Sequence, residues 1–157
     1  DLHSFPTLRS SDLDEIKAFI SNLYWDSNME DNAFVILRNN HTGVVASLHS
    51  TMTQWRHLFS LEVFLEHGYF VLNGLKTSSG TYGDETLTIA KNRSEAPRST
   101  WKDEEEFTFN IDISWKSEVE YFLNAIIYDK DIKIGNSTDA QIIMRMIDSI
   151  YKDGKQL

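Results

Sequence analysis

The chain has 157 residues, a length that fits one domain with one hydrophobic core rather than a dinucleotide domain joined to a second domain of ordinary size. Its 24 acidic and 15 basic side chains give a net charge of -9, which argues against binding to the phosphates of nucleic acids. The absence of cysteine excludes disulfides and thiolate chemistry, and it fits a reducing, cytoplasmic location. No apolar run approaches about 18 residues, so no membrane-spanning segment is expected.

The first residues of the chain are expected to lie outside the folded domain. Residues 4–13 read SFPTLRSSDL, carry no hydrophobic periodicity and join abruptly to Asp14. They resemble the translation of a short-read sequencing adapter, and a native, poorly ordered N-terminus is the alternative. We therefore predict a non-native or disordered leader over residues 1–13 and one folded domain over residues 14–157.

Residues 15–109 have mainly the signals of β-strands. Residues 15–21 alternate apolar and polar side chains with a period of two, and residues 33–37 are apolar on both faces, as in a central strand. Residues 39–43 are rich in turn-forming side chains and predict a hairpin loop. Further strands are predicted at residues 59–65, 69–72, 85–90 and 106–111.

The hydrophobic period becomes helical after residue 113. One apolar stripe at helical spacing consists of Trp115, Val119, Phe122, Leu123 and Ile126. Thr138 and Gln141 have the spacing of a capping box and predict the start of a second helix, which Gly154 is suited to end. Strands followed by two helices predict an α+β fold, with a largely antiparallel open sheet and two C-terminal helices on one face.

The strand that follows the hairpin loop has two different faces. Ala46 and Leu48 share an apolar face that is predicted to join the core. Ser47, His49 and Thr51 lie on the opposite face, which is polar and carries short side chains. Such a face is suited to contact with a ligand or with another part of a protein.

Two common kinds of site are not supported by the sequence. The glycine-rich stretch from Gly74 to Gly83 has neither the Walker spacing nor G-x-G-x-x-G, so a surface loop is predicted there. His49, His57 and His67 are eight and ten residues apart on or beside strands, which does not predict convergent metal ligands. No G-x-S-x-G elbow occurs either. We therefore assign no metal site and no catalytic residue to this chain.

The best candidates for ligand contacts are His49, Thr53, Trp55 and Arg56. Polar side chains beside an aromatic plate suit a sugar, because hydroxyls need hydrogen-bond partners and the apolar face of the ring can stack. Arg56 would bind a carboxylate or phosphate on a modified sugar. Each residue also has a structural alternative: His49 as a satisfied strand residue, Trp55 as part of the core, and Arg56 paired with Glu62.

Three stretches of the chain resemble the C-terminal half of Gfo/Idh/MocA-type oxidoreductases, which use a nicotinamide cofactor on sugars and cyclitols. They are residues 49–64, 73–83 and 114–151, and the overall likeness covers about residues 14–152. The resemblance implies a C-terminal substrate and oligomerisation domain over residues 14–157, with a sugar-type small molecule as substrate. It also implies NAD or NADP in the intact enzyme and a homo-oligomer formed through the sheet.

The departures from this family concern its catalytic parts. The family's glycine-rich cofactor turn is absent, and Pro6 and Pro97, the only prolines, are not part of its Glu-Lys-Pro motif. Its Asp-x-x-x-His pair would fall just before Asp14, where the adapter-like segment stands. The resemblance therefore implies that an N-terminal Rossmann domain is missing and that the chain alone neither binds NAD(P) nor turns over substrate. The alternative is a stand-alone, self-associating binding or scaffold domain.

Overall fold

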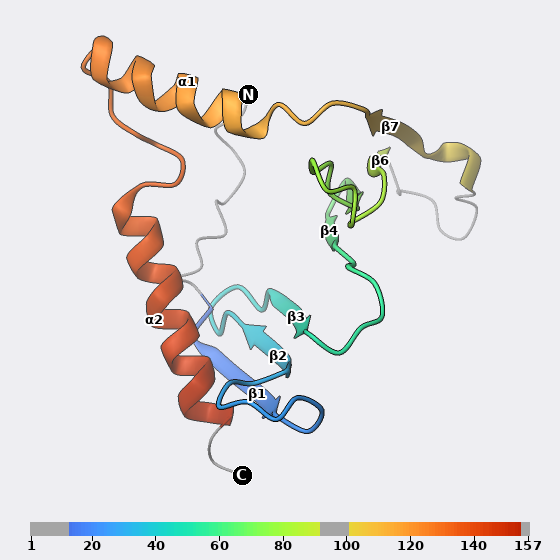
Figure 1. The fold of residues 1–157 in the computed structure, drawn as a ribbon, viewed down its shortest axis with the longest axis vertical. Helices are drawn as coiled ribbons and strands as arrows, with labels where there is room; N and C mark the ends of the chain where they lie inside the picture. Colours follow the sequence, from blue (N-terminus) through green and yellow to red (C-terminus); the bar gives the residue numbers. More distant parts are fainter. Residues whose placement is uncertain (1–12, 92–100, 155–157) are drawn as a thin grey trace. The chain divides into compact units, whose positions relative to one another are not determined.

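A computed structural model describes residues 13–91 and 101–154 of the chain. The predicted leader, apart from Leu13, lies outside the described residues. The described residues divide into two compact units, one formed by residues 13–53 with 130–154 and the other by residues 54–91 with 101–129. The elements, shown in Figure 1, are β1 (Glu15–Ser21), β2 (Asn32–Arg38), β3 (Val45–Thr51), β4 (Ser60–Leu65), β5 (Gly68–Asn73), β6 (Glu85–Lys91), a 3-10 turn (Trp101–Asp103), β7 (Glu105–Phe109), α1 (Ser114–Ile127) and α2 (Ser137–Gly154).

The first unit contains a three-stranded antiparallel sheet in the order β1-β2-β3. In its register Val35 of β2 lies between Ala18 of β1 and Leu48 of β3. The predicted central strand and the predicted period of two in the first strand are both confirmed. Leu48 lies on the core face, as predicted, but it is half-exposed because β3 is at the edge of the sheet.

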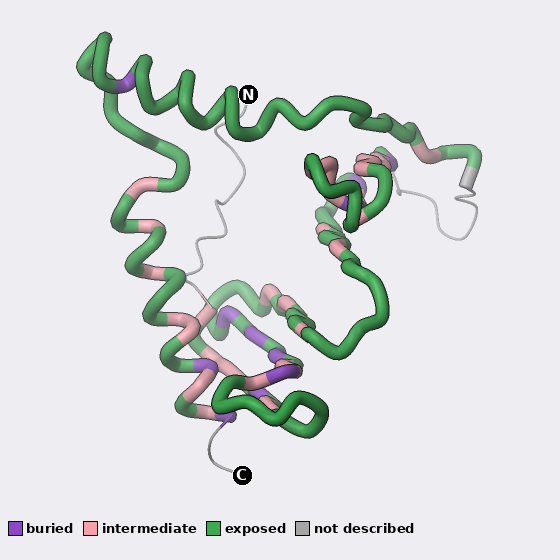
Figure 2. The backbone as a smooth tube through the Cα atoms, in the orientation of Figure 1, coloured by how far each residue is buried: buried purple, intermediate pink, exposed green. Residues whose placement is uncertain are grey.

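Helix α2 covers one face of this sheet and packs mainly against β1. The core of the unit consists of Ala18, Val35, Leu37 and Ile150, with Met146 of the helix packed against it. Figure 2 shows buried stretches in purple along the strands of this sheet and near the end of α2. Removal of these side chains from water is the main stabilising contribution in a unit of this size. Helix α2 is amphipathic: one face packs on the sheet, and its remaining faces are largely exposed.

The start of α2 differs from the predicted capping box. Asn136 is the capping residue: its Oδ1 accepts the backbone N–H of Asp139 at 2.9 Å, and its Nδ2 donates to Oδ2 of Asp139 at 2.8 Å. The prediction that Thr138 and Gln141 form the cap is therefore wrong by two residues. Asparagine caps as well as serine or threonine does, and Asp139 at the third helical position completes the reciprocal pair.

The predicted hairpin loop joins β2 to β3. Asn39 is buried, and its Oδ1 accepts the backbone N–H groups of His41 at 2.8 Å and Thr42 at 2.7 Å. Gly43 has a φ of 75°, a left-handed conformation that glycine adopts without steric cost. These interactions confirm the loop and explain why its turn-forming residues fit there.

The second unit contains a four-stranded antiparallel sheet in the order β4-β5-β6-β7. Gly68 opens β5 after a two-residue turn, and a Cβ atom there would lie 2.3 Å from the carbonyl oxygen of Ala90, so only glycine fits. The register gives this sheet one apolar face, formed by Leu61, Val63, Leu65, Phe70, Leu72, Leu87, Ile89, Phe107 and Phe109. The opposite face is mixed: it carries threonine and glutamate side chains together with Phe64, Tyr69 and Val71.

Helix α1 has the extent that the hydrophobic period predicts, but its apolar stripe is exposed. Trp115 and Ile126 are both more than half exposed, and Ala125 is the buried residue of this helix in the described part of the chain. The α+β class and the antiparallel pairing are confirmed. The strands form two sheets rather than one, because residues 52–59 between β3 and β4 make no strand ladder.

Candidate functional site

The face of the first sheet that lies opposite α2 is open and mixed in character. The register places Phe19, Phe34 and His49 in one row across the three strands, and Ser21, Asn32 and Thr51 in the next row. Phe19, Phe34 and His49 are exposed. The face predicted from Ser47, His49 and Thr51 is therefore confirmed as lying outside the core, and it presents an aromatic row beside a polar one.

His49 is held in place on this face by two neighbours. Its ring stacks on that of Phe34 with a centroid separation of 4.0 Å and an interplanar angle of 9°. Its Nε2 lies 2.9 Å from Oδ1 of Asn32. Because an amide oxygen only accepts, Nε2 is the donor in this pair, which leaves Nδ1 of a neutral ring as an acceptor. The structural alternative and the binding role of His49 are thus compatible.

The other three predicted contact residues lie in the segment that follows β3. The hydroxyl of Thr53 shares a hydrogen bond of 2.8 Å with the hydroxyl of Thr51. Thr53 is the last residue of the N-terminal segment of the first unit. Trp55 and Arg56 belong to the second unit, and the exposure of Trp55 is 102%. The alternative that places Trp55 in the core is therefore wrong. Grouping of His49, Thr53, Trp55 and Arg56 into one site remains a prediction.

The structural alternative for Arg56 is an ion pair with Glu62, and no such pair occurs within residues 13–91 and 101–154. Both side chains are exposed. Arg56 therefore presents its guanidinium to solvent, where it is open to a carboxylate or phosphate.

The glycine-rich loop from Gly74 to Gly83 connects β5 to β6. The hydroxyl of Ser79 lies 3.0 Å from those of Thr77 and Thr81, and Glu85 accepts the backbone N–H of Lys76 at 2.7 Å. A strand, not a helix, follows the loop, so there is no helix N-terminus to receive a phosphate. The described residues also contain no group of three or more side chains suited to a metal ion.

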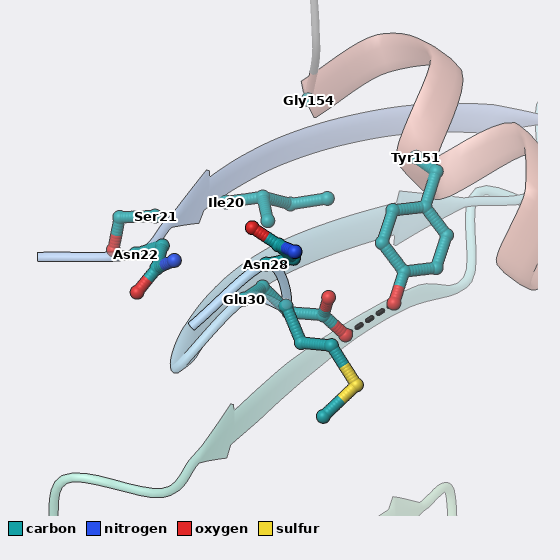
Figure 3. A pocket seen from close by; sticks show the side chains of 8 residues that line it. Ile20, Ser21, Asn22, Asn28, Glu30, Tyr151 and Gly154 are labelled. Atoms are coloured by element: carbon teal, nitrogen blue, oxygen red, sulfur yellow. Dashed lines mark hydrogen bonds between the residues drawn. The ribbon is translucent and has the colours of Figure 1, made fainter. Parts of the chain in front are cut away.

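A pocket that the sequence analysis did not predict lies in the first unit (Figure 3). Its volume is about 310 Å³, and it is bounded by the end of β1, the loop that follows and the end of α2. The hydroxyl of Tyr151 donates a hydrogen bond to Oε1 of Glu30, and the two side chains point toward each other in Figure 3. The pocket is lined by Ile20, Ser21, Asn22, Asn28, Met29, Glu30, Tyr151 and Gly154.

A buried aspartate orders the loop that supplies much of this pocket. Oδ2 of Asp31 accepts the backbone N–H groups of Leu23 at 3.1 Å, Tyr24 at 2.7 Å and Trp25 at 3.1 Å. These hydrogen bonds lower the pKa of Asp31, and the one from the backbone N–H of Tyr24 has the largest effect. The sequence shows an aspartate just before an apolar strand, but it does not show which N–H groups this aspartate accepts, because the loop of residues 22–30 has no regular period.

Comparison with known proteins gives relatives in structure only. No sequence-family description matches the chain, and no curated protein matches it in sequence. UDP-N-acetylglucosamine 3-dehydrogenase GnnA from Acidithiobacillus ferrooxidans superposes with a TM-score of 0.67 at 14% identity, over 93% of this chain and 44% of that one. A candidate NADPH-dependent oxidoreductase from Desulfitobacterium hafniense gives 0.64 at 12% identity, over 92% and 41%. The oxidoreductase candidate YvaA from Bacillus subtilis gives 0.59 at 11%, over 90% and 42%.

These solved structures are oxidoreductases or candidate oxidoreductases by their own names, and their likeness to this chain confirms the α+β fold that the sequence resemblance implies. This chain has the fold of one part of each of these solved structures. It spans less than half the length of the solved structures that it matches. Within the described residues, no helix is long and apolar enough to cross a membrane.

Proposed function

We propose that this chain is the substrate-side domain of an NAD(P)-dependent dehydrogenase that acts on a sugar or sugar derivative. In the intact enzyme, hydride passes between a sugar carbon and the nicotinamide. The observation that carries the proposal is the likeness in fold to a nucleotide-sugar dehydrogenase over more than nine tenths of this chain. The exposed row of His49, Phe34 and Phe19 supports it, because it offers an aromatic and polar surface to such a ligand.

Each predicted contact residue has a role suited to a polyhydroxylated substrate. His49 and Thr53 exchange hydrogen bonds with hydroxyl groups, which both donate and accept. Trp55 stacks on the apolar face of the sugar ring, and its full exposure leaves the indole available. Arg56 binds an anionic substituent such as a carboxylate or the diphosphate of a nucleotide sugar.

The described residues do not fit a nicotinamide dinucleotide by themselves. Such a cofactor needs a glycine-rich turn between a strand and a helix, and the loop from Gly74 to Gly83 joins two strands instead. The cofactor and the groups that transfer protons therefore come, in this proposal, from a dinucleotide domain outside these residues. We expect the 157-residue chain alone to be inactive.

The first test is to sequence the source DNA upstream of the codon for Asp14. An uninterrupted frame of about 150 codons or more, with G-x-G-x-x-G near its start, would support the dehydrogenase proposal. The joined protein would then be assayed for reduction of NAD or NADP with UDP-N-acetylglucosamine and with free sugars. A stop codon close upstream with a native start, or an intact protein that reduces neither cofactor, would contradict it.

A second candidate function is a self-associating binding or scaffold domain. It is favoured by apolar surface in the second unit, where Leu61, Phe107 and Phe109 of the sheet and the stripe of α1 are exposed. Exposed apolar surface of this extent promotes association. Light scattering of the chain should show dimers or larger species, and Phe122→Glu in α1 should reduce them. A wild-type chain that stays monomeric at high concentration would contradict self-association.

A further inference from the structure

Among the described residues that line it, the pocket of the first unit has one carboxylate and no basic side chain. Of these eight residues Glu30 alone carries an ionisable carboxyl, and none is a lysine, arginine or histidine. No ion pair to Glu30 occurs within residues 13–91 and 101–154. The hydrogen bond from Tyr151 lowers the pKa of Glu30, so this carboxyl is ionised at neutral pH. The described lining of the pocket therefore carries one negative charge.

The remaining polar groups leave hydrogen-bond acceptors for a ligand. Tyr151 uses Oε1 of Glu30 and leaves Oε2, which can accept further hydrogen bonds. The amide nitrogen of Asn22 donates to the carbonyl oxygen of Ser27, so its Oδ1 remains as an acceptor. Asn28 lies beside Glu30 in Figure 3 and adds a second amide to the pocket.

The rest of the lining is apolar. Ile20, Met29 and the ring of Tyr151 contribute hydrocarbon or aromatic surface. Close packing of Gly154 on Ile20 holds one wall in position, since a Cβ atom on this glycine would lie 2.7 Å from Cγ1 and Cδ1 of Ile20. The volume of about 310 Å³ is at the lower end of the range for small-molecule pockets, which suits a small organic molecule.

We propose that this pocket binds a small organic ammonium ion, namely a protonated primary amine on a short apolar stem. The ammonium group pairs with Oε2 of Glu30 and donates to neighbouring oxygens, while the stem packs against Ile20 and Met29. A carboxylate in a partly enclosed pocket attracts a cation more strongly than one in open water does. A divalent metal is a poor alternative, because the described residues contain no group of three or more side chains suited to a metal ion, and this pocket has one carboxylate.

This inference goes beyond the proposed dehydrogenase, because it concerns residues of a single unit and needs no cofactor. The test is a titration of the full chain with butylammonium, 1-butanol and butyrate, followed by ¹H–¹⁵N NMR. These probes share one stem and differ in charge. We expect saturable shifts at residues 20–22, 28–30 and 151 with butylammonium, and much weaker effects with the alcohol and the carboxylate. Binding of 1-butanol as tight as that of butylammonium would overturn the proposal.

Two variants test the role of the carboxylate. Glu30→Gln keeps the size of the side chain and removes its charge, and we expect binding to weaken by about ten- to a hundredfold. Glu62→Gln on β4 is the matched control, because Glu62 is an exposed carboxyl in the other unit and its loss should change nothing. Equal weakening in both variants would mean attraction to the net charge of the protein, and no weakening in Glu30→Gln would mean a purely apolar site. Either result would refute the proposal, and if Glu30→Gln does not fold, the comparison of the three probes on the wild-type chain decides.

Discussion

The ring of His49 stacks on the ring of Phe34 across two neighbouring strands, with a centroid separation of 4.0 Å and an interplanar angle of 9°. The pair lies on the open face of the first sheet, so both rings are held in position without being buried. The stacked ring of His49 can therefore offer a ring nitrogen to a ligand while the backbone of His49 remains part of a regular strand.

The first prediction concerns the energy of this stack. Phe34→Ala and His49→Ala should each destabilise the chain, and their double-mutant cycle should give a coupling of about 0.5–1 kcal/mol. Chemical denaturation of the four proteins measures this coupling. The matched control is the cycle of Ile36→Ala and Ser47→Ala, a pair in the same two strands that lacks an aromatic contact. Purely additive losses for Phe34 and His49 would show that the stack contributes nothing.

The second prediction concerns Asp31 and acid. Asp31→Asn keeps the size of the side chain but removes the charge that three backbone N–H groups share, so the loop of residues 22–30 should lose protection from hydrogen exchange. Asp26→Asn, a change in an exposed residue of the same loop, is the control. Equal protection in Asp31→Asn and in the wild type would contradict this account of the loop.

The sign of the pH dependence follows from the lowered pKa of Asp31. Its folded-state pKa lies below the ordinary value of 3.8 because backbone N–H groups favour the charged form. The unfolded chain therefore binds the proton at higher pH than the folded chain does. Stabilisation by Asp31 is present above pH 3.8 and is lost as the pH falls through the folded-state pKa. Acid unfolding followed by circular dichroism measures this effect. The stability of Asp31→Asn should lack the pH dependence that Asp31 contributes, and the same acid unfolding curve for the variant and the wild type would contradict the prediction.

The third prediction concerns the hydrogen bond between Tyr151 and Glu30. Tyr151→Phe removes it and should cost about 1 kcal/mol of unfolding free energy. It should also raise the pKa of Glu30 toward its ordinary value of 4.5, because that hydrogen bond is the main cause of the lowering. An NMR titration of the Glu30 carboxyl checks the direction. Tyr82→Phe in the second unit is the control and should leave Glu30 unaffected.

The fourth prediction concerns the close approach of α2 to β1. Replacing glycine by alanine usually stabilises a helix by up to about 1 kcal/mol. At Gly154 the new methyl would lie 2.7 Å from two atoms of Ile20, so we expect a loss of about 1–2 kcal/mol instead. Ile20→Val in the same protein should recover part of the loss, because it removes Cδ1. Thermal melts of the single and double variants measure both effects, and a stabilised Gly154→Ala would show that the helix end can move away.

The fold could be predicted from the sequence wherever a period was strong. The alternation in residues 15–21 and the helical stripe after Ser114 each placed an element within a residue or two. Local chemistry was less predictable, because Asn136 and Thr138 are both good caps and only the backbone decides between them. The pocket could not be predicted, since Glu30 and Tyr151 are 121 residues apart and meet only when α2 packs on β1.

The division into two sheets could not be predicted from the strand pattern either. Alternation shows which residues share a face of a strand, but it does not show which strands pair. The segment of residues 52–59 carries no alternation, and in the structure it separates β3 from β4. Trp55 and Arg56 lie within this segment. Their closeness to His49 in the sequence therefore does not by itself place them close to His49 in space.

The last prediction tests the substrate contacts in the intact enzyme. Trp55→Ala and Arg56→Ala should each raise KM for the substrate by about tenfold, the equivalent of about 1.4 kcal/mol of lost binding. Both side chains are exposed in the described structure, so these changes should leave the unfolding free energy almost unchanged. Arg145→Ala on an exposed position of α2 is the control for loss of a positive charge. If Arg56→Ala has the same KM and kcat as Arg145→Ala, Arg56 does not contact the substrate, and an anionic group on that substrate is no longer required.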